Sequence, residues 1–596
     1  QAKAVEWYTK AAEQGNKLAQ YNLGTMYQNG TGIAKDEVKA VEWYLKAAEQ
    51  NYSVAQYQLG AMYQNGTGIP KDESKAVEWY RKAAEQNYSV AQYQLGAMYQ
   101  MGMGITKDEV KAVELYRKSA EQNYSVAQYW LGVMHQNGTG VAKDEVKAVE
   151  WYRRSAESGN ADAMVLIGYA HEQGQGGLAA DPTKAIEWYR KAAEAGSSVA
   201  MYNLGIMYAN GKGTAKDQAK AVEWDTKAAE RGYAKAQNNL GDMYYNGKII
   251  AKDEAKAVTW YTKSAEQGYA EAQANLGYMY KNGTGVAKDL FKAMEWYAKA
   301  AEQGNAYAQT ALGSMYRDGE GTAKDETKAV QWYTKAAEAG NAMAQSNLGY
   351  MYEAGKGVVK DEIKAMNLYA KAAAQGDAYA QYNLGWGYDS GRGVTKDETK
   401  AMEWLQKAAE QGNTSAMVKL GIMYLYKVKF KDFMFWVQKA ADMGNVDGMY
   451  HVAYAHSKGF SGQGTNNTLA VEWYQKAVDK GSSMAMINLG AMYGDGLGVQ
   501  KSKKKAYELY LKAAEAGQPI AMFNIGKYYE EGRGYVGQDF NEAGRWYLKV
   551  LDADPKLDVP DGGDSVRTMA ISALRELVSQ NKLNSDVLQK IPLSAL

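Results

Sequence analysis

Several residue types are missing from this chain or scarce in it. None of the 596 residues is cysteine, which excludes disulfides, cysteine-ligated zinc and a thiol nucleophile within the chain. No run of about 18 apolar residues occurs, so the sequence predicts no membrane-spanning helix. The formal net charge is only +1, which argues against nucleic acid or an anionic membrane as the main partner, because both select a basic face.

Proline and phenylalanine are also rare. The chain has 6 prolines and 7 phenylalanines against 48 tyrosines. A chain of this length is too long for one ordinary hydrophobic core, so we expect several domains or an extended array. Such a biased composition indicates internal repeats. The opening residues match the second half of the repeated unit described below, so we expect the natural N-terminus to lie upstream.

One Leu-Gly motif recurs along the chain at a nearly constant spacing of 36 residues. The spacing is 37 residues before Gly205 and Gly490, and 32 before Ala453, which replaces the glycine in one unit. Such a fixed period is typical of solenoid proteins. The aligned positions are Gly24, Gly60, Gly96, Gly132, Gly168, Gly205, Gly241, Gly277, Gly313, Gly349, Gly385, Gly421, Ala453, Gly490 and Gly526.

Each repeat contains two amphipathic helical patterns, which we call helix A and helix B. Residues 16–30, NKLAQYNLGTMYQNG, are typical of helix A, and residues 36–50, DEVKAVEWYLKAAEQ, are typical of helix B. The loop between them carries two glycines suited to left-handed turns, and Asp36 suits the start of helix B. A lone helix pair cannot bury its aromatic face, so we expect a stack of pairs, a right-handed superhelix whose inner surface is lined mainly by helix A.

The repeat resembles a known family. The pattern A-x-x-x-L-G-x-M-Y, a G-x-G loop and K-A-x-x-W-Y-x-K-A-A-E-x-G are similar to the Sel1-like repeats, relatives of the tetratricopeptide repeats with longer loops, from residue 2 to about 550. The resemblance implies an all-α fold of about fifteen 36-residue repeats and a scaffold that binds proteins or peptides. It also implies a bacterial protein, exported or at the cell envelope. Some relatives carry a disulfide in each repeat, which this chain cannot form.

The array departs from its own pattern in a few places. We expect the solenoid to cover residues 1–550, with irregular junctions near 171–185 and 426–462, and a linker with a C-terminal helix in 551–596. The final helix either caps the last apolar face or docks a partner, and capping is the simpler interpretation. Asp225 stands where nearly every other helix B has tyrosine, and we expect a loosened junction there.

The chain offers little that resembles a catalytic or metal site. His135, His171 and His456 each occupy a position that holds tyrosine in most repeats, so we interpret them as packing residues. His451 and His456 are five residues apart, which is poor spacing for a metal pair on one helix. The G-x-G loops join helix to helix and lack the strand and Lys-Ser/Thr of a phosphate loop. We therefore predict no catalytic residue, no metal and no cofactor.

The inner face carries residues that the repeat does not need for its core. Asparagine precedes the Leu-Gly pair (Ile-Gly in the last unit) in eight repeats, and by resemblance to tetratricopeptide superhelices it would bind an extended peptide backbone; alternatively, it ties helix A to the neighbouring repeat. Tyrosine stands one residue earlier in many repeats, and Trp130 and Trp386 are the only tryptophans outside helix B. The predicted partner-binding residues are Tyr21, Asn22, Tyr57, Tyr93, Tyr129, Trp130, Tyr202, Asn203, Asn239, Asn275, Asn347, Tyr382, Asn383, Trp386, Asn488 and Asn524.

These patterns predict a non-enzymatic scaffold that binds a protein or extended peptide on the concave face. The alternative is a module that binds cell-wall glycan over the same aromatic face, because tyrosine and tryptophan also serve sugars. We expect no nucleic acid partner and no membrane insertion. By the resemblance, we place the protein in the bacterial periplasm, at the cell envelope or outside the cell, with the cytoplasm as the alternative.

Overall fold

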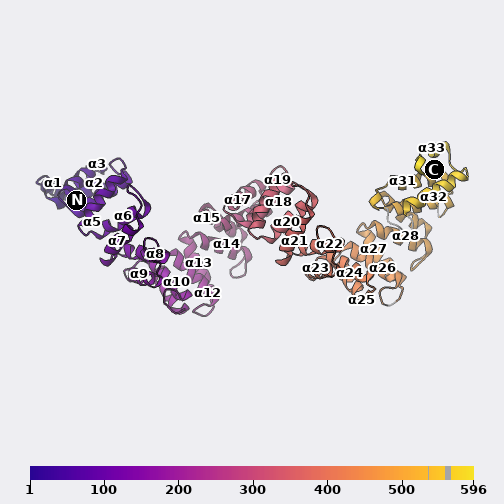
Figure 1. Cartoon of the computed structure of the whole chain (residues 1–596), viewed down its shortest axis with the longest axis horizontal. Helices are drawn as coiled ribbons and strands as arrows, with labels where there is room; N and C mark the ends of the chain where they lie inside the picture. Colours follow the sequence, from indigo (N-terminus) through magenta and orange to yellow (C-terminus); the bar gives the residue numbers. More distant parts are fainter. Residues whose placement is uncertain (463, 534–535, 558–564, 596) are drawn as a thin grey trace. The chain divides into compact units, whose positions relative to one another are not determined.

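The computed structural model describes residues 1–462, 464–533, 536–557 and 565–595, and in these residues every regular element is helical. Helices follow one another in pairs, and each helix packs against the next along the chain within its unit (Figure 1). The chain divides into two compact units, Gln1–Asn305 and Ala306–Leu596. The expected all-α repeat architecture is confirmed.

The first unit contains seventeen helices, α1 to α17. Odd-numbered helices are helix B and even-numbered helices are helix A. Their bounds are α1 Ala2–Glu13, α2 Lys17–Asn29, α3 Glu37–Glu49, α4 Ser53–Asn65, α5 Glu73–Glu85, α6 Ser89–Met101, α7 Glu109–Glu121, α8 Ser125–Asn137, α9 Glu145–Glu157, α10 Ala161–Gln173, α11 Pro182–Glu194, α12 Ser198–Asn210, α13 Gln218–Glu230, α14 Ala234–Asn246, α15 Glu254–Glu266, α16 Ala270–Asn282 and α17 Leu290–Glu302.

The second unit continues the same alternation and then ends in a different structure. Its bounds are α18 Ala306–Asp318, α19 Glu326–Glu338, α20 Ala342–Ala354, α21 Glu362–Ala374, α22 Ala378–Ser390, α23 Glu398–Glu410, α24 Thr414–Tyr426, α25 Phe430–Asp442, α26 Val446–Lys458, α27 Asn467–Asp479, α28 Ser483–Asp495, α29 Lys503–Glu515, α30 Pro519–Glu531, α31 Phe540–Asp552, η1 Pro555–Leu557, α32 Val566–Ser579, α33 Ser585–Leu588 and η2 Leu593–Ala595.

The helix ends follow the turn chemistry of the sequence. The Asp36 carboxylate accepts a hydrogen bond from the backbone N–H of Lys39 (3.0 Å) and so caps α3, as predicted. After the helix, Asn51 adopts a positive φ of 60°, as expected for a left-handed residue that ends a helix. Asn87 and Asn123 do the same in the next two repeats.

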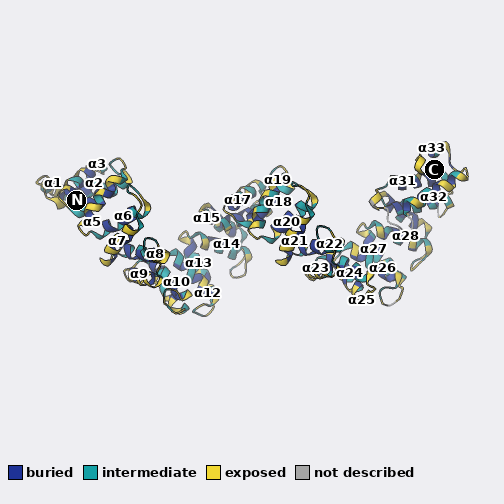
Figure 2. Cartoon of the chain, viewed as in Figure 1, coloured by how far each residue is buried: buried dark blue, intermediate teal, exposed yellow. Residues whose placement is uncertain are grey.

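The glycine of the Leu-Gly motif allows helix A and helix B to pack closely. A Cβ added to Gly24 would lie 2.8 Å from the Tyr44 ring and 3.2 Å from the Ala40 carbonyl. Tyr44 is fully buried, and its hydroxyl donates to Gln28 on helix A (2.7 Å). The small glycine and the large tyrosine therefore fit against each other, and the same contact recurs in the following repeats. Figure 2 shows the buried residues on the sides where helices meet.

The G-x-G loop is a structural contact between repeats. Gly66 and Gly68 both have positive φ, 72° and 67°. A Cβ on Gly68 would lie 2.3 Å from the Glu37 carbonyl oxygen, at the start of the preceding helix B. The second glycine is thus required because the loop rests on the first turn of α3, and its role is to hold adjacent repeats together.

The tryptophan of helix B covers the seam between repeats. Trp79 on α5 packs over the core that contains Ala48 of the previous helix B and Leu59 of α4. The Lys82 ammonium lies 3.9 Å from the centre of its indole ring. The same pair forms between Trp43 and Lys46 at 4.0 Å. A cation on the ring face adds about 0.5–1 kcal/mol at such an exposed site.

Two junctions differ from the regular pattern. Helices α24 and α25 are joined by residues 427–429 only, and Val428 has a positive φ of 58°. Helices α10 and α11 are joined by the longer segment 174–181, which contains Gly176 and Gly177, both with positive φ. A Cβ on Gly176 would lie 2.3 Å from Val149, so this loop also rests on the preceding helix B.

The C-terminal helix α32 covers the last repeat. Val566, Ala570 and Leu574 are fully buried in one cluster with Tyr547 and Val550 of α31. The apolar face of the last helix pair is therefore covered by the chain itself, as the capping interpretation predicts. Residues 558–564 of the expected linker lie outside the described residues.

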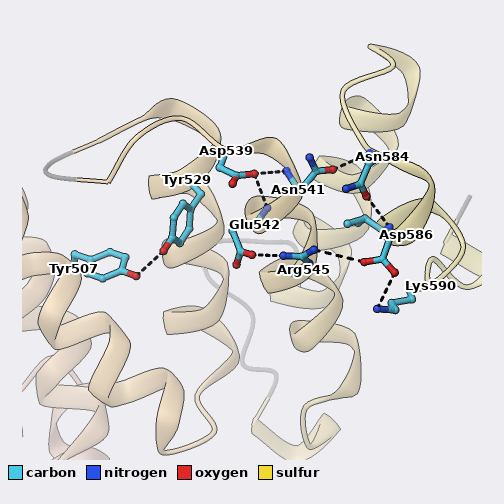
Figure 3. A network of polar contacts seen from close by, with 10 residues as sticks. Tyr507, Tyr529, Asp539, Asn541, Glu542, Arg545, Asn584, Asp586 and Lys590 are labelled. Carbon is cyan, nitrogen blue, oxygen red and sulfur yellow. Dashed lines mark hydrogen bonds and ion pairs between the residues drawn. The ribbon is translucent and has the colours of Figure 1, made fainter.

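Polar contacts fix the end of this cap to α31 (Figure 3). The backbone N–H of Asn584 donates to the Asn541 side chain at 2.8 Å. The Arg545 guanidinium lies 3.5 Å from the Asp586 carboxylate. Gly544 leaves room for this segment, because a Cβ there would lie 2.9 Å from Val587.

None of the described helices is both long and apolar enough to cross a bilayer.

Candidate functional site

The predicted tyrosines of helix A form a repeated row of aromatic pairs in the first three full repeats. Tyr21 packs edge to face against Tyr52, the residue at the start of the next helix A, with ring centres 5.5 Å apart. Tyr57 does the same with Tyr88 at 5.6 Å. All four rings are partly exposed. The same pair therefore recurs at the same place in successive repeats, which produces an aromatic surface with the period of the array.

The row continues with small changes. Tyr93 lies 5.6 Å from Tyr124, and Tyr202 lies 5.3 Å from Tyr233. Burial raises the pKa of Tyr93, so its phenol is neutral at physiological pH and can donate a hydrogen bond.

The other predicted aromatics differ from one another in exposure. Tyr129 and Trp130 are partly buried and pack at 86° with ring centres 5.7 Å apart. Tyr382 is also partly buried, beside the core of α23 and α24. Trp386 is 39% exposed, and the Arg392 guanidinium lies 4.2 Å from the centre of its ring. Trp386 is thus the most accessible of the predicted aromatic anchors.

Four of the eight asparagines contact groups of their own chain. Asn275 donates to Asn238 of the preceding helix A (3.0 Å), and Asn488 donates to Tyr450 (3.2 Å). Asn239 lies beside Asp225, and its amide lowers the pKa of that carboxyl. Asn383 is buried and donates to the Tyr379 carbonyl of its own helix (3.0 Å). The contacts of Asn239, Asn275 and Asn488 reach the preceding repeat, as the structural alternative predicts, whereas Asn383 contacts its own helix.

The remaining four asparagines are partly exposed. Within the described residues, their side-chain amides make no hydrogen bond to the rest of the chain. Their amide donors and acceptors are therefore available to a ligand. These residues are Asn22, Asn203, Asn347 and Asn524.

In the middle of the first unit, α13 carries a buried carboxyl where the earlier repeats carry a tyrosine. Asp225 is only 3% exposed and faces Gly205, so close that a Cβ there would lie 2.6 Å from Oδ1. Burial raises its pKa to about 7, and the hydrogen bond from Asn239 lowers it by less. Helices α13 and α14 still share one core with α12, so the expected loosening is not visible in their packing.

A second carboxyl, which is half-buried, lies one repeat further on. Asp242 accepts hydrogen bonds from Tyr261 (2.7 Å), Asn238 (3.1 Å) and Asn275 (3.4 Å). Burial raises its pKa, and the Tyr261 and Asn238 donors oppose that rise. Helices α14 to α16 thus carry an amide and carboxyl network. Of its amides and its carboxyl, only Asn238 stands at a position that holds tyrosine in α2 to α8.

A buried glutamine ladder was not predicted from the sequence. Gln56 of α4 donates to the Ala48 carbonyl at the end of the preceding helix B (3.1 Å). Its own carbonyl oxygen accepts from Gln86, 30 residues later, at 2.6 Å. This arrangement recurs at Gln20 and Gln92. Ladders of side-chain amides therefore join the repeats, but the residues that build them are glutamines at the repeat seams.

The ladder is incomplete at Gln128. Its amide donates to the Ala120 carbonyl at 3.1 Å, but its buried carbonyl oxygen has no partner. The residue 30 positions later is Ser158 in place of glutamine, which explains the missing donor.

The four histidines are buried or half-buried. His135, His171 and His456 are buried at the tyrosine position, and burial lowers the pKa of each. His451 lies between the Phe433 and Tyr450 rings, and burial also lowers its pKa. Within the described ranges, no three His, Asp or Glu residues lie close enough together to hold a metal ion.

The sequence pattern of the Sel1 repeat matches most of the chain. The chain belongs to the Sel1 repeat family. The matched ranges are residues 1–16, 17–52, 53–88, 89–124, 125–160, 161–197, 198–233, 234–269, 270–305, 306–341, 342–377, 378–413, 434–445, 446–482, 483–518 and 519–553. Sel1 repeats are generally scaffolds for protein interactions. The unmatched stretch 414–433 contains the three-residue junction between α24 and α25.

Solved structures give the same family. A protective antigen present in uropathogenic Escherichia coli strains, with an SLR fold, is 34% identical, with 82% of this chain and 96% of that chain covered and a TM-score of 0.55. A Sel1 repeat protein from Oxalobacter formigenes is 36% identical over 51% of this chain and 87% of its own, with a TM-score of 0.40. Among curated proteins, no match to the chain is found.

Proposed function

We propose that this Sel1 repeat protein is a non-catalytic scaffold that binds an extended segment of a partner protein along its helix A face. The observation that carries the proposal is the row of partly exposed tyrosine pairs, Tyr21–Tyr52, Tyr57–Tyr88 and Tyr93–Tyr124. A row with the period of the repeats suits a ligand that runs from repeat to repeat. Tyrosine is also enriched where proteins bind one another, because it combines contact area with a polar tip.

The unpaired asparagines supply the polar part of this surface. Asn22 and Asn203 each follow a row tyrosine, Tyr21 and Tyr202, by one residue. Their amides would satisfy the backbone groups of an extended peptide, whereas Asn239, Asn275, Asn383 and Asn488 act within the scaffold. The asparagines would thus be divided between the two roles considered from the sequence, peptide binding and contacts within the scaffold.

The geometry of the tyrosine pairs favours a peptide over a glycan. In the Tyr21–Tyr52 pair the planes meet at 72°, so the edge of one ring covers the face of the other. Sugar rings stack on open aromatic faces. Trp386 is exposed, but Arg392 lies over one face of its ring, so only the other face could bind a sugar. Glycan binding is therefore the second candidate, and Trp386 is its strongest support.

We place the protein at the bacterial cell envelope or outside the cell. The similar E. coli protein is a protective antigen, and exposure to the host is common among such antigens. The other similar structure reported above is also bacterial.

Peptide selection followed by calorimetry tests this function. A random library of peptides is selected on the full chain, and the best peptide is titrated into wild type, Tyr57→Ser/Tyr93→Ser and the control Glu150→Ala on the exposed side of α9. We expect the tyrosine variant to bind at least tenfold more weakly and the control to bind as wild type does. Peptidoglycan fragments are titrated in parallel. Glycan binding that Trp386→Ala abolishes, without peptide binding, would favour the second candidate.

A further inference from the structure

Three repeats lack the tryptophan that covers the seam between neighbouring helix B segments. Leucine replaces it at Leu115 on α7, Leu368 on α21 and Leu509 on α29, whereas every other helix B keeps the indole. The cation three residues later is retained in all three repeats, as Lys118, Lys371 and Lys512.

Where the tryptophan ring is missing, the residue of the preceding helix B that it would cover is more exposed to solvent. Beneath Leu115, Ala84 is 8% exposed, against 2% for Ala48 beneath Trp79 and 1% for Ala120 beneath Trp151. The equivalent residues beneath the other two leucines, Ala337 and Val478, are only partly buried.

A cavity occupies this place in the first unit. It measures about 710 Å³, and its lining includes the apolar residues Ala84, Leu95 and Leu115 together with Tyr99. Its exposed charged residues are Arg81, Glu85, Lys111, Glu114 and Lys118. In the second unit, a cavity of about 420 Å³ is lined at the matching positions by Val478, Leu509, Tyr493, Lys505 and Lys512, with Met486 in place of the buried glutamine. The cavity thus appears at two of the three positions where leucine replaces tryptophan, once in each unit.

The floor of the first cavity offers contact area but few free hydrogen-bonding groups. The Gln92 amide donates to Ala84 (3.3 Å) and to Asn87 (2.9 Å), and its oxygen accepts from Gln122 (2.7 Å). Because the polar groups of Gln92 are already hydrogen-bonded within the chain, the base of the cavity suits an apolar ligand group better than a polar one. At the rim, Lys118 occupies the place from which Lys82 contacts Trp79, so its charge is complementary to the electron-rich face of an aromatic ring.

We propose that the Leu115 and Leu509 cavities each bind an aromatic side chain, preferably the indole of a tryptophan, from a segment of a partner protein. The entering ring takes the position that the chain's own tryptophan holds in the neighbouring repeats. Lys118 or Lys512 then lies over its face, as Lys82 lies over Trp79. The cavities share no lining residue with the predicted helix A site, so this proposal is independent of the proposed function.

A fluorinated tryptophan amide tests the proposal on the full chain. N-acetyl-5-fluorotryptophanamide is titrated with protein and followed by ¹⁹F NMR line width, with N-acetyl-leucinamide and unlabelled N-acetyl-tryptophanamide as competitors. In wild type we expect broadening that the tryptophan amide reverses and the leucine amide does not. The variant Leu115→Trp/Leu368→Trp/Leu509→Trp restores a tryptophan ring at all three leucine positions. It should bind the fluorinated tryptophan amide at least tenfold more weakly.

The reverse substitution is the matched control. Trp79→Leu uncovers Ala48 and should add a site, so broadening per protein should rise above wild type. If the triple variant does not fold, the variant Lys118→Gln/Lys512→Gln tests the proposal instead. Both lysines are exposed, so the variant should fold, and their loss should weaken binding several-fold. Equal binding by wild type and the folded triple variant, or by the lysine variant, would overturn the proposal. So would self-association of the wild type that the triple variant loses, because the ring would then come from a second copy of this chain.

Discussion

The repeats between α4 and α9 and those between α12 and α16 share one scaffold but present different surfaces. Both keep the Leu-Gly pair, the buried alanines and the aspartate cap of helix B. In the first region helix A adds tyrosines such as Tyr57 and Tyr93, whereas in α14 of the second region Asn238 takes that position. Asp242 on the same helix stands where the first region has alanine or valine. The comparison shows that the residues that define the fold can stay fixed while neighbouring positions of the same helix change from aromatic to polar.

The two regions also differ in what lies beneath these positions. In the first, Tyr80 is a fully buried ring against Gly60, with its hydroxyl bonded to Gln64 (2.7 Å). In the second, Asp225 takes this position and remains buried, with one oxygen unpaired. A buried carboxyl is costly for the folded state unless it holds its proton. The polar region should therefore be the less stable of the two and the more sensitive to pH.

The largest loss of stability is expected when a buried tyrosine of the aromatic region is replaced by the aspartate that the polar region has at that position. Tyr80→Asp removes a buried ring and buries a carboxyl, and it should destabilise the repeats around α5 by about 4 kcal/mol. Native-state hydrogen exchange of α4 to α6 measures the loss, and Glu78→Ala on the exposed side of α5 is the control. Unchanged protection in Tyr80→Asp would show that the buried ring is not what holds this region together.

A pH titration of stability should separate the regions next. The folded pKa of Asp225 is raised to about 7 from 3.8, so the folded state holds a proton that the unfolded state releases between these values. Stability of the polar region should therefore fall as pH rises from about 4 to 7, by on the order of 4 kcal/mol, and stay low above 7.

Asp225→Asn tests this assignment. The variant should lose most of the pH dependence in thermal unfolding, with a smaller slope remaining from Asp242, whose pKa is also raised. A slope as steep as that of wild type would assign the titration to another group.

The glutamine ladder gives a smaller effect within the aromatic region. Ser158→Gln would supply the donor that Gln128 lacks and should stabilise that seam by about 1 kcal/mol. Gln86→Ser should destabilise the complete seam at Gln56 by a similar amount, because it removes an existing donor. Urea unfolding of both variants gives the comparison, and a Ser158→Gln midpoint at or below wild type would contradict it.

The smallest effect concerns the lysine over the tryptophan. Lys82→Gln should cost about 0.5–1 kcal/mol, because it removes a cation from the Trp79 ring. Lys118→Gln removes the equivalent lysine where Leu115 stands, and in the absence of ligand it should cost close to nothing. Thermal unfolding at low salt compares the two, and equal losses would indicate that helix charge, not ring contact, explains the lysine.

Much of the fold could be predicted because each repeat samples the same pattern again. The contact of Gly24 with Tyr44, the cap at Asp36 and the left-handed Asn51 all follow from local spacing and residue type. The pairing of Trp43 with Lys46 is separated by three residues on one helix, and this spacing could have indicated it.

Other features depend on how repeats stack. Gln20 and Gln50 are 30 residues apart, and their hydrogen bond is fixed by the register between helices of one stack. For the same reason Tyr52 could not be placed beside Tyr21, and Asn275 could not be assigned to Asn238 rather than to a ligand. The cavity at Leu115 arises from a missing side chain, which only the packed structure reveals.

Site-specific photocrosslinking tests the central claim that the helix A face is the binding surface. p-Benzoylphenylalanine is placed at position 57 or 93 on helix A, or at position 150 on the exposed side of helix B, and the protein is irradiated with its selected peptide. We predict crosslinks from positions 57 and 93 and none from position 150. Crosslinks from position 150 alone, or equally from all three positions, would contradict the account.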